Sequence, residues 1–294
     1  MNQTTVNKID KKASRFLGKQ THNYDLSYSP DLLVPIERSL NRDAYGITNE
    51  DFEGFDIWHN YECSFLLDNG YPLTLVGKIK IPSNSKYFIE SKSMKLYFFS
   101  MHMKKFGKTK HEAIENYKSI VTKDLSSKVE KPVEFEVFDK LSYEDPFTDN
   151  FEDISCFADI DNLNFENYKE SPDLLELSNK TGYFTLRFNG FRSNCRVTHQ
   201  PDFSNIFIAI SGNTPSMDSL VRYLVSFRNE FHFHEEVTEQ IFKALKEKYK
   251  PNSLLVGNLF TRRGGIDICP IRRFNYPEQP IESIMDLTIP TIYQ

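Results

Sequence analysis

Alternating apolar and polar residues mark the strands that the first half of the chain predicts. Residues 73–81 (LTLVGKIKI) and 133–138 (VEFEVF) alternate over their whole length, and 86–90 predicts a shorter strand. Residues 93–106 and 111–125 instead place apolar side chains three and four positions apart, which is the spacing of one helix face. The first half therefore runs strand, strand, helix, helix, strand.

The second half of the chain repeats this order. Residues 220–227 and the stretch from about 234 to 249 predict helices, and strands are expected around them at 183–188, 206–210, 253–260 and 266–268. Because the two halves share one order of elements, we expect an α+β fold built from two tandem modules. We place the first module at residues 1–145, with an irregular N-terminal segment, and the second at 146–294.

Two long segments carry no regular pattern. The first 60 or so residues are polar and rich in turn-forming residues, and residues 141–176 are acidic and irregular. We interpret 141–176 as the connection between the two modules. A solvated surface loop within a single domain is the alternative interpretation.

Composition narrows the class of protein. The 294 residues include 39% hydrophobic and 14% aromatic side chains, which is enough to bury a sizeable core. The net charge of −5 argues against direct nucleic-acid binding, which usually needs a strongly basic face. No apolar run approaches the roughly 20 residues that a membrane helix requires, and the N-terminus has no apolar signal-peptide core. We therefore expect a cytoplasmic protein without a membrane segment.

The most informative segment is a polar stretch, residues 193–202, that follows an apolar strand and contains Cys195. The four cysteines of the chain form no CxxC pair, so each is judged alone. Arg192 and Arg196 beside Cys195 would favour its reactive thiolate, and Asp202 would act as an acid if burial kept it protonated. An incidental cysteine at the end of a strand is the alternative, and residue types alone favour that alternative.

His232, His234 and Glu235 stand close together in the segment NEFHFHEE. Their spacing is not the HExxH of a zinc site, so we expect no metal at these residues. Such residues more often bind a polar ligand or cap a helix.

A second segment suited to a ligand contains Arg262 and Arg263, followed by Gly264 and Gly265. Guanidinium groups bind phosphate in a bidentate way, and glycine allows a backbone amide to approach an anion closely. These residues therefore predict a phosphate site. A tight turn with two solvated arginines is the alternative.

Ser91, Lys92 and Ser93 open a predicted helix, whose first amides attract anions. The carboxylate of Glu90, directly before them, would accept paired N–H donors from a purine-like base if it faced inward. The alternative is a helix cap flanked by a solvent-facing glutamate.

Taken together, these segments resemble the QueF family of nitrile reductases. The resemblance covers nearly the whole chain, in the right order. It rests on ESKSMKLY at 90–97, SNC at 193–195 with QPD at 200–202, YLVSFR at 223–228, and RRGGIDI at 262–268. The N-terminal stretches 17–33 and 39–47 are similar to those of the long, two-module form.

The resemblance implies a fold, an activity and a set of residues. The fold is the tunnelling fold, here with tandem modules, antiparallel sheets and helices packed on one face; a homodimer is the implied assembly. The activity is the reduction of 7-cyano-7-deazaguanine (preQ0) to 7-aminomethyl-7-deazaguanine (preQ1) with two NADPH, in queuosine biosynthesis. Cys195 is the implied nucleophile, which forms a thioimide, and Asp202 the proton donor. The implied substrate contacts are Ile89, Glu90, Ser91, His234 and Glu235, and the implied NADPH contacts are Ser91, Lys92, Arg263 and Gly264.

Two departures from the family pattern and two other functions stay open. The family usually has HNEFHE before the last long helix, so His232 is a rival for the role of His234, and Cys269 stands where the family often has asparagine. A thiol hydrolase or amidase would use Cys195 with His199 or His234 as its base. A non-catalytic purine-binding module would keep Glu90 and His234 and make Cys195 dispensable.

Overall fold

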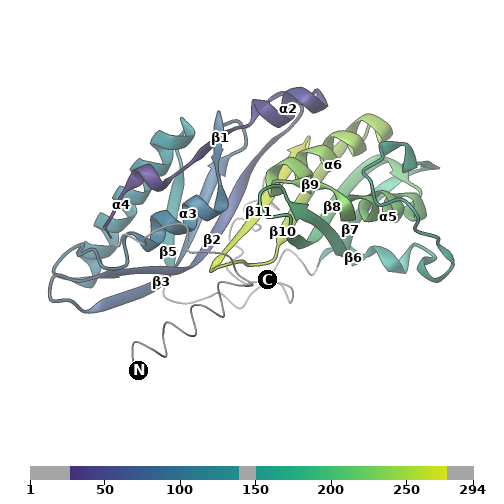
Figure 1. Cartoon of the computed structure of the whole chain (residues 1–294). Helices are drawn as coiled ribbons and strands as arrows, with labels where there is room; N and C mark the ends of the chain where they lie inside the picture. Colours follow the sequence, from purple (N-terminus) through teal and green to yellow (C-terminus); the bar gives the residue numbers. More distant parts are fainter. Residues whose placement is uncertain (1–26, 139–149, 277–294) are drawn as a thin grey trace.

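The computed structural model describes residues 27–138 and 150–276, which form one main antiparallel sheet with helices on one side of it (Figure 1). The strands are β1 (Pro35–Glu37), β2 (Glu53–Leu66), β3 (Pro72–Pro82), β4 (Tyr87–Ile89), β5 (Glu134–Phe138), β6 (Glu152–Asp153), β7 (Leu177–Cys195), β8 (Pro201–Pro215), β9 (Phe231–His232), β10 (Ser253–Phe260) and β11 (Ile266–Phe274). The helices are α2 (Ser39–Tyr45), α3 (Ser91–Phe99), α4 (Lys110–Val129), α5 (Met217–Ser226) and α6 (His234–Tyr249).

The two halves of the chain meet inside this sheet. Its strand order is β5-β3-β2-β11-β10-β8-β7-β6, and β9 pairs with β7 beside that path. The last strand, β11, lies between β10 of its own half and β2 of the first half, and both pairings are antiparallel. β1 and β4 form a separate two-stranded ribbon. The seam between the halves is thus a continuous strand pair, β2–β11.

Alternation along the strands divides the core into layers. Two clusters lie between the sheet and the helices: Trp58, Ile79 and Phe135 belong to the one that packs on α3 and α4, while Ile208 and Val256 belong to the one that packs on α5 and α6. A third, smaller cluster lies on the opposite face of the sheet and comprises Ile57, Phe151, Phe207, Ala209, Leu255, Leu259, Cys269 and Ile271. The expected α+β class, with antiparallel strands and helices on one face, is confirmed.

The residues predicted for several elements match the structure closely. The last long helix and the strand after it, predicted at 234–249 and 253–260, are α6 and β10. The helix predicted at 93–106 is shorter, because α3 ends at Phe99, and the strand predicted at 266–268 continues to Phe274 as β11. The boundary that we placed at residues 145 and 146 lies outside the described residues, so the division into two modules stays a prediction.

Residues 27–60 are more regular than their sequence indicates. They contain β1, α2 and the start of β2, a 14-residue strand that the hydrophobic pattern did not predict. The centre of β2 is buried on both faces, with apolar Ile57 and Trp58 next to polar Asp56, His59 and Asn60. Because polar side chains are buried there beside apolar ones, the alternation that identifies a half-buried strand is lost.

None of the helices in the two described ranges combines the length and the apolar character that crossing a membrane requires.

A buried network of ion pairs fills the seam between the halves. Asp56 of β2 accepts a hydrogen bond from Arg38 and forms an ion pair with Arg272 of β11, whose Nη1 lies 2.8 Å from Asp56 Oδ1. Glu239 of α6 lies 2.8 Å from Arg272 Nη2 and 2.6 Å from Nη2 of Arg42 in α2. Burial acts to raise the pKa of Asp56, but Arg272 and Arg38 hold it below its usual value. The network therefore ties β2, β11, α2 and α6 together through charged groups.

We expect Asp56→Asn to lower the free energy of unfolding by about 3–5 kcal/mol, because it leaves Arg38 and Arg272 buried without their carboxylate. The matched control is Glu53→Gln, which breaks the pair between Glu53 and Arg273 at 2.9 Å; Glu53 is exposed, so the expected cost is about 0–1 kcal/mol. Urea unfolding measures both. Equal midpoints for the two variants would contradict a stabilising role for the seam network.

Candidate active site

The hairpin of β7 and β8 places Cys195 and Asp202 on one face of the sheet. Ser193 of β7 is the register partner of Asp202 of β8, so their side chains point to the same side. Cys195 lies two residues beyond Ser193 and shares that side. Diagonal neighbours of this kind have Cα atoms about 7–8 Å apart, which leaves room for a short linear group between a thiol and a carboxyl.

The turn that follows Cys195 holds the thiol in place. The backbone N–H of His199 donates to the carbonyl of Cys195 at 2.9 Å, and the N–H of Cys195 donates to the carbonyl of Gln200 at 2.8 Å. His199 adopts a positive φ of 58°, which lets the chain reverse within this short turn. The N–H of Thr198 lies 3.5 Å from Cys195 Sγ, so a backbone donor faces the sulfur.

The two arginines next to Cys195 in sequence are engaged with other groups. Arg196 forms an ion pair of 2.7 Å with Glu236 of α6, and Arg192 donates to the side chain of Asn194 at 3.0 Å. The sequence predicted that both would favour the thiolate. In the structure Arg196 instead balances a carboxylate at the start of α6.

Asp202 is buried between a guanidinium and an imidazole. Arg263 Nη1 lies 2.8 Å from Asp202 Oδ1, and His234 Nε2 lies 3.5 Å from Asp202 Oδ2. The Asp202 side chain is 4% exposed, whereas that of Arg263 is 39% exposed. The carboxylate is therefore held from the solvent side by Arg263, a contact that sequence reasoning did not predict.

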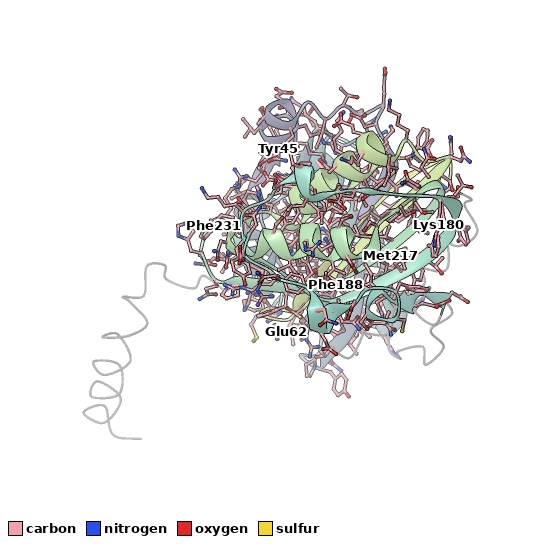
Figure 2. The ribbon with its side chains drawn as sticks, turned by 90° about the vertical axis from the view of Figure 1, so that its right-hand side faces the viewer. Tyr45, Glu62, Lys180, Phe188, Met217 and Phe231 are labelled. Atoms are coloured by element: carbon pink, nitrogen blue, oxygen red, sulfur yellow. The ribbon has the colours of Figure 1, made fainter. Side chains whose placement is uncertain are left out.

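The first residue of α6, His234, points into the site. Its ring stacks on Phe260 at the end of β10, with centroids 3.9 Å apart and an interplanar angle of 18°. The rival His232 is the register partner of Cys195 in the β7–β9 pair, yet its Nδ1 lies 3.3 Å from Gln240 Nε2. His232 is thus buried against α6, and the placement favours His234 as the residue that faces a ligand. Phe231, the neighbour of His232 in β9, is exposed at the left edge of Figure 2.

Glu235, the second residue of α6, carries an unusual carboxyl group. Its side chain is buried, and its Oε1 has no hydrogen-bond partner within the described residues. Burial and the nearby charge of Asp56 raise the pKa of Glu235 to about 8, against the opposing effect of Arg38 and Arg272. An unpartnered, buried carboxyl group is suited to a ligand that brings its own N–H donors.

The segment before α3 is arranged differently from its predicted role. The carboxylate of Glu90 caps α3, accepting from the backbone N–H of Lys92 at 2.9 Å and of Ser93 at 2.7 Å. Ser91 Oγ lies 3.4 Å from the same carboxylate, and Ile89 is buried in the core of the first half. In this arrangement the first backbone N–H groups of α3 donate to the carboxylate oxygens of Glu90, so both sets of groups are hydrogen-bonded. The cap is the alternative that the sequence left open for Glu90, and the role of Glu90 as a substrate contact stays a prediction.

The loop between β10 and β11 lies against α3. A Cβ at Gly264 would meet Lys95 Nζ at 2.3 Å, and Gly264 has a positive φ of 55°. Lys92 lies one helical turn before Lys95 on α3. Lys95 therefore lies beside the backbone of Gly264, Arg263 precedes that glycine in the loop, and the positive φ of Gly264 favours glycine there. This arrangement suits a phosphate group.

One aromatic contact brings the first half to the start of α6. Phe88 of β4 packs edge-on against Phe233, the N-cap residue of α6, with ring centroids 5.2 Å apart. The chain that leads into α3 therefore borders His234 and Glu235. The structure brings together Cys195, Asp202 and residues from the start of α6, with α3 and the glycine loop on their flank.

Cys269 lies on the opposite face of the sheet, away from Asp202. Its Sγ is 3.7 Å from Asp267 Oδ1, and His59 Nδ1 is 2.7 Å from the same oxygen. Tyr61 donates to the other oxygen of Asp267 at 2.8 Å. His59, Asp267 and Cys269 form a group with metal-ligating chemistry, but the contacts to Asp267 already satisfy its carboxylate. Alternation along β11 explains this placement, since Ile268 faces the helices and its neighbour Cys269 faces the other side.

The sequence reasoning missed Lys95, Phe260 and the contact between Arg263 and Asp202. Lys95 lies within the motif ESKSMKLY, and its position one turn after Lys92 is the signal that would have identified it. Phe260 reads as the last apolar residue of a strand, so no local pattern marks it. The Arg263–Asp202 contact joins residues far apart in sequence and is visible only in the fold.

The comparisons with known proteins agree on one family. Residues 24–137 match a model described as nitrile reductase, 7-cyano-7-deazaguanine-reductase N-term, and residues 201–279 match one described as QueF-like protein. Two relatives are both named NADPH-dependent 7-cyano-7-deazaguanine reductase. The one from Psychrobacter cryohalolentis is 35% identical over 91% of this chain and 96% of its own length. The one from Acinetobacter baumannii is 38% identical over 87% and 92%.

A solved structure of an archaeosine synthase QueF-Like in the apo form also aligns with the chain. It does so with a TM-score of 0.29 and 15% identity, over 34% of this chain and 98% of that one.

The raised pKa of Glu235 predicts that its carboxyl group is mostly neutral at pH 7 in the ligand-free protein. Infrared difference spectra should show a protonated carboxyl band that is lost with a midpoint near pH 8 and is missing from Glu235→Gln. Loss of the band well below pH 7 would contradict this prediction.

Proposed function

The chain belongs to the 7-cyano-7-deazaguanine reductase family of nitrile reductases, and we propose that the site at the β7–β8 hairpin carries out that reaction. The chain is an NADPH-dependent oxidoreductase that reduces the nitrile of 7-cyano-7-deazaguanine to a primary amine, a step of queuosine biosynthesis. The homodimer and the lack of direct nucleic-acid contact stay predictions from the resemblance, because no contact in the structure bears on them.

One observation carries the assignment of roles: a thiol and a buried carboxyl group lie on the same face of one hairpin. In the proposed first step, the thiolate of Cys195 attacks the nitrile carbon and forms an S–C bond. The carbon–nitrogen triple bond becomes a double bond, and Asp202, which takes up the proton that leaves the Cys195 thiol, gives that proton to the nitrogen. The product is a covalent thioimide. His234 lies next to Asp202 and can pass on a proton after the first one has moved.

The cationic loop fits the cofactor. Lys95 lies against Gly264, Arg263 directly precedes this glycine, and Lys92 is one turn earlier on α3. Phosphate is the group that such a set of cations binds best. Ser91 lies beside Lys92 at the start of α3. When bound there, each of two successive NADPH molecules would supply one hydride. Two hydrides and the matching protons account for the four electrons between a nitrile and an amine.

The base of the substrate is recognised at the start of α6. A deazaguanine ring offers N–H donors at N1 and at its amino group, and a carboxylate accepts such a pair in a bidentate way. Glu235 supplies a buried carboxyl oxygen without a partner in the described structure, and the ring stack of His234 on Phe260 borders it. Ionisation of Glu235 upon binding would release a proton at neutral pH.

The alternative functions predict a different use of the cofactor. A thiol hydrolase or amidase consumes no NADPH, and a purine-binding module turns nothing over. We expect the absorbance of NADPH to fall upon addition of 7-cyano-7-deazaguanine, with two NADPH oxidised for each amine formed. Product without NADPH oxidation would assign the site to hydrolysis.

We expect enzyme mixed with the nitrile in the absence of NADPH to gain the mass of one substrate molecule, because Cys195 forms the thioimide before any hydride arrives. Cys195→Ala should abolish the adduct in intact-mass spectra. Cys156→Ala is the matched control, since Cys156 is also a free thiol and is exposed, and it should keep the adduct. Formation of the adduct in the Cys195→Ala variant would show that Cys195 is not the nucleophile.

Asp202→Asn should slow formation of this adduct by about 10²–10⁴-fold, the usual effect of a general acid. Affinity for the nitrile, measured in the Cys195→Ala background to prevent chemistry, should change far less. A stopped-flow rate within threefold of the wild type would show that Asp202 is not the proton donor.

A further inference from the structure

We propose that Arg263 is shared between Asp202 and the cofactor: the ribose phosphate of NADPH competes with the Asp202 carboxylate for the same guanidinium. The inference rests on the proposed function, because it assigns a phosphate-bearing cofactor to the loop between β10 and β11. It goes beyond that function by coupling the cofactor site to the proton donor.

The burial of the two partners shows which of them can move. Asp202 is 4% exposed and is fixed in β8, whereas Arg263 is 39% exposed and enters from a loop. Only Oδ1 of Asp202 is held by Arg263, at 2.8 Å; Oδ2 faces His234 Nε2 at 3.5 Å. A guanidinium that leaves Asp202 therefore moves toward solvent, while the carboxylate keeps His234 as a neighbour.

The backbone of the loop stays fixed while the Arg263 side chain changes partner. The N–H of Arg263 donates to the carbonyl of Ile266 at 2.8 Å, and the N–H of Ile266 donates back at 3.2 Å. Gly264 follows with a positive φ of 55° and lies against Lys95 of α3. A rotation of the Arg263 side chain is therefore enough to turn the guanidinium from Asp202 to a phosphate bound beside the loop.

A phosphate bound through the Nη1–Nη2 edge of Arg263 competes with Asp202 for the same guanidinium group. A phosphate is bound most strongly when two parallel N–H groups of one guanidinium face two of its oxygens. Nη1 of Arg263 already contacts Asp202. A bidentate contact to phosphate through the guanidinium edge that includes Nη1 therefore requires this ion pair to open. By linkage, phosphate binding weakens the Asp202–Arg263 contact by the same factor as that contact weakens phosphate binding. The binding of the hydride source, which follows thioimide formation, is thereby tied to the opening of the ion pair of Asp202.

The test is a double-mutant cycle on cofactor binding without chemistry. NADP⁺ and NAD⁺ differ only in the ribose phosphate and carry no hydride, so titration calorimetry reports binding alone. Asp202→Asn frees Arg263 from its ion pair and should increase the affinity for NADP⁺ about three- to tenfold. Arg263→Ala should decrease the affinity for NADP⁺ about ten- to a hundredfold. In the double variant the gain from Asp202→Asn should disappear, and NAD⁺ should respond to neither change.

A matched control separates the shared contact from a general effect of charge. Glu62 of β2 (labelled in Figure 2) lies against Gly265 of the same loop, so Glu62→Gln removes an equal charge there and leaves the Asp202–Arg263 pair in place. It should change the NADP⁺ affinity less than twofold. A gain in tightness for Glu62→Gln as large as that for Asp202→Asn, or an equal gain for NAD⁺, would overturn the proposal.

The remaining outcomes distinguish this inference from the proposed function. If Arg263→Ala weakens NADP⁺ binding but Asp202→Asn does not tighten it, the proposal that Arg263 is shared is wrong. The role of the loop in binding the cofactor then still stands. If wild-type protein binds NADP⁺ no better than NAD⁺ and oxidises no NADPH with the nitrile, the proposed function itself fails. Structural damage to the loop would weaken binding in every variant and would not produce the gain expected for Asp202→Asn.

Discussion

Three guanidinium groups and two carboxylates are buried together where the halves of the chain meet, and the rest of the site depends on this arrangement. Arg272 and Asp56 have no exposed side-chain surface, so each needs its partner from another element. The charges are satisfied only when β2, β11, α2 and α6 are all in place. The network therefore fixes the position of α6 relative to the sheet in a way that nonpolar packing, which tolerates small shifts, would not.

The same network sets the properties of the substrate end of the site. Glu239 and Glu235 are four residues apart on α6 and share a face, so the element that holds Glu239 also places Glu235. Asp56, whose charge is required by the arginines, is one of the charges that raise the pKa of Glu235. A carboxyl group that is neutral before the ligand arrives costs less to bury than an ionised one. The seam thus provides a buried hydrogen-bonding group without an unpaired charge in the core.

The sequence predicted the regular parts of the fold and the identities of most candidate residues, but not how those residues pair. α6 and β10 were predictable because their apolar spacing reflects a single buried face, whereas β2 is buried on both faces and its polar residues belong to the seam. Glu90 shows a second limit of prediction from the sequence. Its position before α3 is compatible with both a ligand and a cap, and only the coordinates show its oxygens on the amides of Lys92 and Ser93.

The chemistry is divided between rigid and movable parts of the molecule. Cys195 and Asp202 lie on paired strands, where a hairpin register fixes the gap that a nitrile has to fill. Arg263 is on a loop with two glycines at positive φ, and its side chain is the exposed member of the pair with Asp202. Bond formation to the nitrile needs fixed geometry, while the cofactor has to enter and leave between the two hydride steps. In the proposed mechanism, a fixed pair of reacting groups with one movable cation between them and the cofactor meets both needs.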